Sequence, residues 1–181
     1  MTAKLKYIQE IVTIPSSVTA TVTGKTVTIK GKKGELTKTV SQPDLKVEMK
    51  DGKIIISSKI LRKKNKMFAG TASAHIANMI KGVEKPFHYT LKICSGHFPI
   101  NVSVANNIVS VKNFLGEKIP RTMHLSPLAT VKINGSEIIV ESIDIDVAGQ
   151  TAAKIEQVTR ITDKDRRVFQ DCIDIISKGD K

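Results

Sequence analysis

Hydrophobic and polar residues alternate along residues 18–23 and 26–30, and three further short strand-like stretches follow in the first third of the chain. A period of two is typical of strands that bury one face, so these stretches are predicted to be strands. Gly24 and the Asp51-Gly52 pair lie between successive stretches and favour hairpin turns. The five predicted strands cover residues 18–23, 26–30, 36–40, 46–49 and 53–57.

The hydrophobic period changes after these strands. Apolar residues then recur at spacings of three and four, which predicts a helix with one buried face. Gly82 follows this stretch and is a helix-stop signal. The apolar positions are Phe68, Ala72, Ile76, Met79, Ile80 and Val83.

The rest of the chain repeats the order of strands followed by a helix. Asn106-Asn107 and Asn134-Gly135 mark turns between alternating stretches. A helix is expected over about 147–161, capped by Asp144 or Asp146, and a shorter one over 164–176. The predicted strands cover residues 87–93, 101–104, 108–112, 122–124, 130–133 and 137–142.

The two halves also resemble each other in sequence. Residues 27–35 (VTIKGKKGE) resemble residues 109–117 (VSVKNFLGE), at an offset of 82. Two later matches, 52–58 with 135–142 and 71–77 with 151–157, follow in the same order at nearly the same offset. The short strands joined by tight turns indicate antiparallel pairing. We therefore expect an α+β fold of two tandem homologous modules, 1–82 and 83–181, each a mostly antiparallel sheet packed with one main helix.

The net charge of +12 is concentrated in the first module. Residues 1–82 carry a net charge of +11, and residues 83–181 carry +1. Such an excess is self-repelling unless an anionic partner neutralises it, which leaves nucleic acid, an anionic membrane surface or an acidic protein. Trp is absent and aromatic residues make up 4% of the chain, which favours recognition of phosphates and RNA shape over base stacking.

Several classes of protein do not fit this composition. No apolar run approaches the roughly 20 residues that span a bilayer, and residues 1–10 lack the apolar core of a signal peptide. Two cysteines make no disulfide framework and favour a reducing, intracellular location. Cys94 and His97 have the spacing of metal ligands, but no second pair exists, so no metal is expected. His75 is expected to pack in the first helix, and no catalytic signature is present, so neither a cofactor nor an enzyme is expected.

Three basic segments are candidates for RNA contact. Residues 59–66 (KILRKKNK) precede the predicted first helix and suit phosphate neutralisation, although such runs are also found in solvated loops. Residues 30–34 (KGKKG) form a glycine-bracketed turn that either contacts RNA or only closes a hairpin. This turn lacks the spacing of a P-loop. Residues 164–167 (KDRR) mix charges at a predicted helix start and either dock on RNA or form local ion pairs.

These strings together resemble one family. Residues 96–101 (GHFPIN) and 113–118 (NFLGEK) are similar to the signature of the universal large-subunit ribosomal protein six family, called ribosomal protein L-nine in eukaryotes. Further matches are residues 14–18 (IPSSV), 27–36 (VTIKGKKGEL) and 78–83 (NMIKGV), and Lys164-Asp165 with Phe169, which resemble the family's C-terminal helix. The resemblance covers about residues 7 to 179. Lys32 stands where the family usually has proline, the usual Trp is missing beside Met67-Phe68, and residues 172–176 are unusual, which indicates a divergent eukaryotic member.

The resemblance implies a structural constituent of the cytosolic large ribosomal subunit. It implies that the protein binds and braces ribosomal RNA near the stalk base and the sarcin–ricin loop, beside neighbouring ribosomal proteins and without a membrane, a small-molecule substrate or a homo-oligomer. An RNA-binding factor that acts off the ribosome and an RNA-processing enzyme are the alternatives. The expected RNA contacts are Lys30, Lys32, Lys33, Arg62, Lys63, Lys64 and Lys66 in the first module and His97, Lys112, Lys118, Arg121, Lys164, Arg166 and Arg167 in the second.

Overall fold

The chain folds into two compact units, Met1–Pro86 and Phe87–Lys181. The computed structural model describes residues 8–50 and 52–179. Asp51 lies outside the described residues, so the hairpin expected at Asp51-Gly52 is described only from Gly52 onward. The second unit starts a few residues after the predicted boundary because the first helix runs past Gly82. Within the described residues, no helix is long and apolar enough to cross a membrane.

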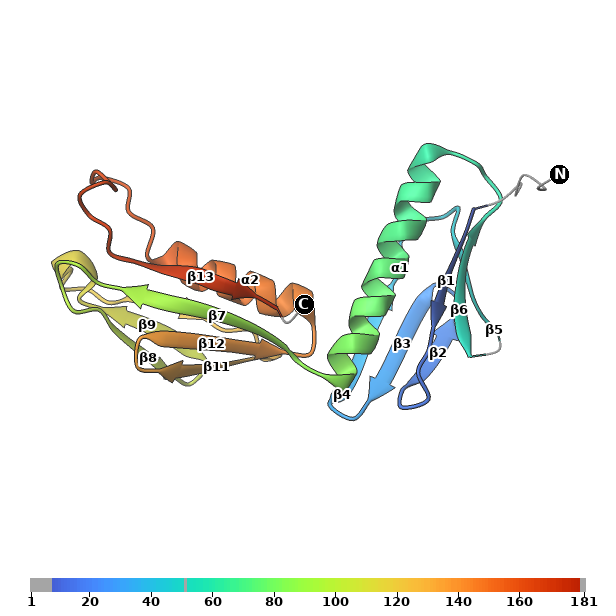
Figure 1. Cartoon of the computed structure of the whole chain (residues 1–181), viewed down its shortest axis with the longest axis horizontal. Helices are drawn as coiled ribbons and strands as arrows, with labels where there is room; N and C mark the ends of the chain where they lie inside the picture. The colour runs from blue at the N-terminus through green and yellow to red at the C-terminus, as the bar shows by residue number, and fades with distance from the viewer. Residues whose placement is uncertain (1–7, 51, 180–181) are drawn as a thin grey trace. The chain divides into compact units, whose positions relative to one another are not determined.

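In the first unit, the described strands form two antiparallel sheets, ordered β1-β6-β5 and β2-β3-β4. The helix α1 (Lys63–Glu84) runs along these strands (Figure 1). The five predicted strands are confirmed; β1 was not predicted, because its apolar residues Ile8, Ile11 and Val12 do not alternate. The strands are β1 (Ile8–Thr13), β2 (Thr19–Thr23), β3 (Thr26–Gly31), β4 (Gly34–Thr39), β5 (Lys46–Lys50) and β6 (Lys53–Ser58).

The core of the first unit lies between α1 and these strands. Ile54 and Ile56 of β6 are fully buried, as is Val27 of β3. On the helix, Ile76 and Val83 are buried, as the three- and four-residue spacing predicted. Burial of an aliphatic side chain of this size contributes about 2 kcal/mol, so the apolar pattern determines which side of α1 faces the strands.

The second unit has the same order of elements. Its strands form two antiparallel sheets, ordered β10-β9-β8 and β11-β12-β7-β13 among the described residues. All six predicted strands and the first predicted helix are confirmed, and Asp144 caps that helix by accepting a hydrogen bond from the amide of Asp146. The elements are β7 (Phe87–Cys94), β8 (Asn101–Ala105), β9 (Ile108–Lys112), the short 3₁₀ helix η1 (Phe114–Gly116), β10 (Arg121–His124), β11 (Ala129–Asn134), β12 (Glu137–Ser142), α2 (Ile145–Val158) and β13 (Cys172–Lys178).

The helix predicted over residues 164–176 is wrong, and so is the C-terminal helix implied by the family resemblance. Residues 172–178 form β13, which pairs antiparallel with β7. The reason lies in the side-chain period: Ile173 is fully buried, and Ile175 packs on the same core two residues later. Two apolar residues at a spacing of two extend the sheet, and β7 offers the free edge that receives them.

Corresponding hydrogen bonds in the two units agree with the duplication. The amide of Ile14 donates to the carbonyl of Gly52 at 3.1 Å, and the amide of Ile93 donates to the carbonyl of Ser136 at 2.8 Å. Each bond joins the end of one strand to the turn that precedes its neighbouring strand in the sheet. Two tandem α+β modules with antiparallel sheets are therefore shown, and each module divides its strands between two small sheets.

Candidate nucleic-acid interface

The basic segment before α1 extends into the helix. Lys63, Lys64 and Lys66 lie in the first turn of α1, with Arg62 as the N-cap residue, whereas the sequence had placed the whole segment before the helix. The first turn contains no acidic residue, and all four cationic side chains are exposed. Cations at a helix N-terminus oppose the helix dipole, so this arrangement is unfavourable until an anion binds there.

Asn65 fixes the segment in place, and its role was missed in the sequence. Its side-chain amide is buried and donates to the hydroxyl of Ser58 at 3.3 Å and to the carbonyl of Ile60 at 3.2 Å. The only sign of this anchoring role in the sequence is that Asn65 is a small polar residue among four cationic ones. The result is that the cationic side chains project from an anchored backbone.

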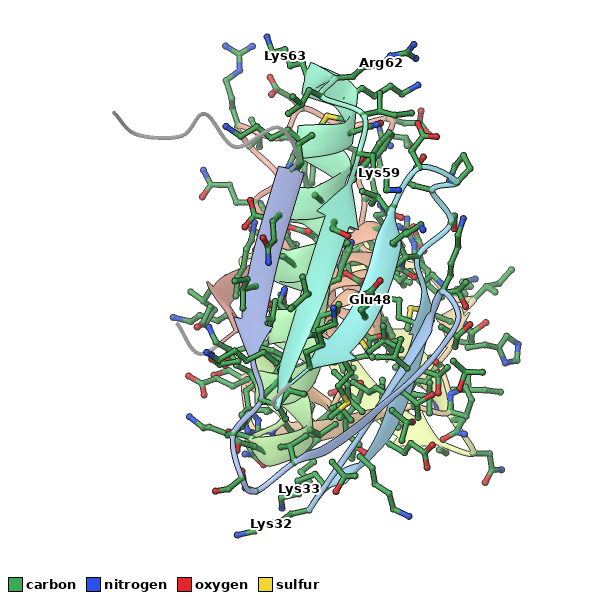
Figure 2. The ribbon with its side chains drawn as sticks, turned by 90° about the vertical axis from the view of Figure 1, so that its right-hand side faces the viewer. Lys32, Lys33, Glu48, Lys59, Arg62 and Lys63 are labelled. Atoms are coloured by element: carbon green, nitrogen blue, oxygen red, sulfur yellow. The ribbon has the colours of Figure 1, made fainter. Side chains whose placement is uncertain are left out.

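The second basic segment, at the β3–β4 turn, is packed against the other end of α1. The amide of Lys33 donates to the carbonyl of Val83 at 3.1 Å. Lys30, Lys32 and Lys33 are exposed. Figure 2 shows Lys32 and Lys33 at one end of the unit and Arg62 and Lys63 at the other. A helix of 22 residues is about 33 Å long, so the two basic segments are separate contact surfaces.

Gly31 is required for the close approach of this turn to α1. A Cβ atom at Gly31 would lie 2.8 Å from Cγ2 of Val83 and 2.9 Å from its carbonyl oxygen. We expect Gly31→Ala to lower the free energy of unfolding by about 2 kcal/mol, since either the turn or the helix end must move. Urea unfolding of the full chain measures this. Gly70→Ala is the control, because nothing lies within 4 Å of that position, and helix propensity makes the change neutral or stabilising. An unchanged stability in Gly31→Ala would contradict the tight packing.

In the second unit, the signature segment 96–101 is bound by one buried carboxylate. Asp171 is fully buried and accepts hydrogen bonds from the amide of Gly96 at 2.6 Å and the amide of His97 at 3.1 Å. The ring Nδ1 of His97 lies 2.9 Å from the second carboxylate oxygen. Burial alone would raise the pKa of Asp171, but the hydrogen bonds from His97 and Gly96 outweigh it and lower the pKa. Asp171 was missed in the sequence because its partners are more than seventy residues away.

The loop after β7 also packs on the 113–118 string. The side-chain amide of Asn113 donates to the carbonyl of Pro99 at 3.1 Å, and a Cβ atom at Gly116 would lie 3.5 Å from the ring of Phe98. Asn113 and Leu115 both have left-handed backbones, with φ of 60° and 50°. A positive φ is costly for leucine, and such strain is concentrated at functional sites. Segments 96–101, 113–118 and 162–171 therefore converge.

One cation and one aromatic ring are held beside this carboxylate. The ring of Phe169 lies 5.1 Å from the ring of His97, and the ammonium of Lys164 lies 4.8 Å above Phe169. The side chain of His97 is 42% exposed, and Lys164 is exposed as well. Arg166 lines an adjoining pocket of about 490 Å³ together with Phe169 and Arg160. Arg167 pairs with Asp165 at 3.3 Å, which is one of the local ion pairs considered for this segment. Lys112 and Lys118 are exposed.

Arg121 is committed to interactions within the unit. Its guanidinium donates to Glu117 at 2.8 and 2.5 Å and to the carbonyls of Val158 at 2.8 Å and Arg160 at 3.0 Å. It also lies 4.5 Å above the buried ring of Phe114. The hydrogen bond from Arg121 lowers the pKa of Glu117 despite the opposing effect of burial. We therefore assign Arg121 a structural role and leave it out of the proposed RNA-contacting set.

Cys94 and His97 are not brought together as a ligand pair. Cys94 lies opposite Cys172 across the β7–β13 pair, whereas His97 turns to Asp171. Burial, followed by the nearby carboxylate of Asp174, raises the pKa of the Cys172 thiol to about 12, so it is protonated at neutral pH. Within residues 8–50 and 52–179, no cluster of three or more histidine, cysteine or acidic residues could hold a metal ion.

Two tandem α+β modules with clustered, exposed lysine and arginine side chains are typical of a nucleic-acid-binding protein. The sequence model of the family "Ribosomal protein L6" matches residues 14–85 and 98–172. The chain is 42% identical to the large ribosomal subunit protein uL6 of Desulfurococcus amylolyticus, over 98% of both chains. It is 40% identical to the large ribosomal subunit protein uL6 of Methanococcus vannielii, over 96% of both chains.

The chain belongs to the ribosomal protein L6 family. It is a structural protein of the large ribosomal subunit and not an enzyme, and its partners are ribosomal RNA and other ribosomal proteins. The resemblance to this family that was found from residues 96–101 and 113–118 is confirmed. That the chain is a eukaryotic member stays a prediction.

Proposed function

We propose that the protein braces ribosomal RNA near the stalk base and the sarcin–ricin loop of the large subunit, and so supports cytoplasmic translation. Three groups of side chains make the contacts: the N-terminus of α1, the β3–β4 turn, and the end of the second unit around Asp171. The contacting residues are Lys30, Lys32, Lys33, Arg62, Lys63, Lys64 and Lys66, with His97, Lys112, Lys118, Lys164, Arg166 and Arg167.

The observation that carries the proposal is a chain of contacts: the buried Asp171 binds His97, the ring of Phe169 lies beside His97, and the ammonium of Lys164 lies over Phe169. A buried carboxylate with three hydrogen-bond donors fixes this loop without any RNA present. The ammonium of Lys164 neutralises a phosphate, and the exposed imidazole donates to a phosphate or a 2′-hydroxyl. Such contacts position a folded RNA by its backbone, in keeping with a chain that has few aromatic residues.

Site-directed hydroxyl-radical probing of assembled large subunits tests the location. An iron chelate is tethered at Lys118→Cys or Lys63→Cys in a chain whose native cysteines are changed by Cys94→Ser and Cys172→Ser. We expect cleavage of ribosomal RNA at the sarcin–ricin loop and the stalk base from position 118. Cleavage confined to other regions of the RNA would contradict the proposed location but not the membership of the large subunit.

A further inference from the structure

The first unit has no described counterpart of β13. Strand β1 occupies the position of residues 87–92 in β7, because Thr13 pairs with Lys53 at the start of β6 as Lys92 pairs with Glu137 at the start of β12. In the second unit, β7 lies between β12 and β13. In the first unit, β1 is the outer strand of its sheet, as Figure 2 shows, and pairs only with β6 among the described residues.

The backbone groups on the outer edge of β1 can be identified from the pairing. The amide of Ile14 points toward the β6 side, where it donates to Gly52. Because backbone groups alternate in direction along a strand, those of Gln9, Ile11 and Thr13 point away from β6. The equivalent groups of β7 face β13. The outer edge of β1 therefore presents a short row of donors and acceptors that an added strand can satisfy.

The packing around β1 has room for such a strand. Val12 is half-buried, whereas Leu91 at the equivalent position of β7 is fully buried. On the helices, Gly70 and Gly149 each lie six residues before a buried isoleucine, Ile76 in α1 and Ile155 in α2. A Cβ atom at Gly149 would meet the hydroxyl of Tyr89 at 3.3 Å, whereas nothing lies within 4 Å of Gly70. The apolar layer beside β1 is less complete than its duplicate.

Apart from the charged side chain of Glu10, β1 lacks the features that usually keep an edge strand from pairing. It contains no lysine, no proline and no bulge, and Ile11 is 55% exposed. Natural edges with such a composition are normally covered by another element. We propose that the outer edge of β1 binds an extended segment of another protein of the large subunit, which adds an antiparallel strand to the β1-β6-β5 sheet.

Two other occupants are less favourable. RNA offers phosphate acceptors in abundance, but the edge also presents carbonyl acceptors that need donors, and Glu10 is the only charged residue on β1. A second copy of the chain would bring together two units that each carry a large positive charge, which repel. A protein strand supplies donors and acceptors in register. Aliphatic residues at alternate positions of that strand would extend the core, as Ile173 and Ile175 do in the second unit.

Photocrosslinking in purified large subunits tests the proposal. A benzophenone side chain is placed at position 13, next to the outer edge, in the full chain. The test variant is Ile11→Pro, which removes an outward amide and leaves the bonds from Glu10 and Val12 to β6 in place. The matched control is Ile11→Thr, which keeps the amide and shortens the side chain. The amount of chain bound to the subunits is measured separately, so a failure of assembly is distinguished from a failure of edge pairing.

We expect crosslinks to one identified segment of another ribosomal protein. The yield should fall about tenfold in Ile11→Pro, as loss of a ladder hydrogen bond implies, and change by less than about twofold in Ile11→Thr. Amide exchange gives a second measurement on the unaltered chain: the amides of Gln9, Ile11 and Thr13 should exchange at least about tenfold more slowly in subunits than in the free protein. Crosslinks to RNA or to a second copy, equal yields in the two variants, or unchanged exchange would each overturn the proposal.

Discussion

Replacing Asp171 with alanine is expected to lower the free energy of unfolding of the second unit by about 3 kcal/mol. The carboxylate is fully buried and accepts hydrogen bonds from the amides of Gly96 and His97 and from the ring of His97. Alanine leaves both amides, which lie in a partly buried site, without this acceptor. Amide exchange of β7 and β13 in the full chain measures the loss, and exchange in the first unit serves as the internal reference.

Asp171→Asn is the matched variant for this prediction. Asparagine keeps the shape and one acceptor oxygen but no negative charge, so it should cost about half as much as alanine. Binding to ribosomal RNA should weaken in both variants, because His97 and Lys164 lose their fixed positions. Equal stability of wild type and Asp171→Ala would contradict the anchoring role that we assign to the carboxylate.

The lowered pKa of Asp171 also gives the sign of a pH dependence. Since its pKa is lower in the folded than in the unfolded chain, the ionised carboxylate stabilises the second unit above its unfolded pKa of about 3.9. That contribution is lost as the pH falls from this value through the folded pKa. The difference in stability between wild type and Asp171→Asn should therefore shrink toward acid pH. Unfolding of both proteins by urea between about pH 2 and pH 6 measures it, and a constant difference would rule out ionised Asp171 as the source.

The sequence predicted what depends on local pattern. Every predicted strand, the two main helices and the cap at Asp144 were found, because alternation and three- to four-residue spacing are properties of neighbouring residues. What it missed depends on distant residues. β13 was read as a helix because its strand character comes from pairing with β7, about eighty residues earlier. Arg121 was predicted to contact RNA, and no local pattern indicated that the fold brings the carbonyls of Val158 and Arg160 to it.

The sequence predicted which types of residue form the candidate site, but not which of these residues lie close together in the fold. The lysines of the first unit are exposed, as a charged run suggests, but the fold separates Lys32 and Lys33 from Arg62 and Lys63 by the length of α1 (Figure 2). Conversely, His97 and Lys164 are far apart in the chain, and both lie close to the ring of Phe169. Tertiary contacts that no local pattern encodes decide which cations act together.

Removing the three lysines at the start of α1 is expected to weaken RNA binding and to strengthen the fold. The combined change Lys63→Ala, Lys64→Ala and Lys66→Ala removes cations from the positive end of the helix dipole, so the free energy of unfolding should rise by about 1 kcal/mol. If each lysine neutralises a phosphate, the slope of log K against log salt should fall by about 2 to 3. At about 0.15 M salt, the affinity for large-subunit RNA should drop by roughly a hundredfold.

The control removes the same charge from another surface. Lys46, Lys50 and Lys53 are exposed on β5 and β6, away from the proposed contacts, and their combined replacement by alanine lowers the net charge equally. Filter binding to large-subunit RNA at several salt concentrations gives both slopes, and urea unfolding gives both stabilities. An equal loss of slope in the two triple variants would show that net charge alone drives binding. Only the first variant is expected to bind RNA more weakly and also to be more stable. This result would show that the three lysines lower the stability of the fold but contact phosphates at the start of α1, because a purely structural role cannot produce both changes at once.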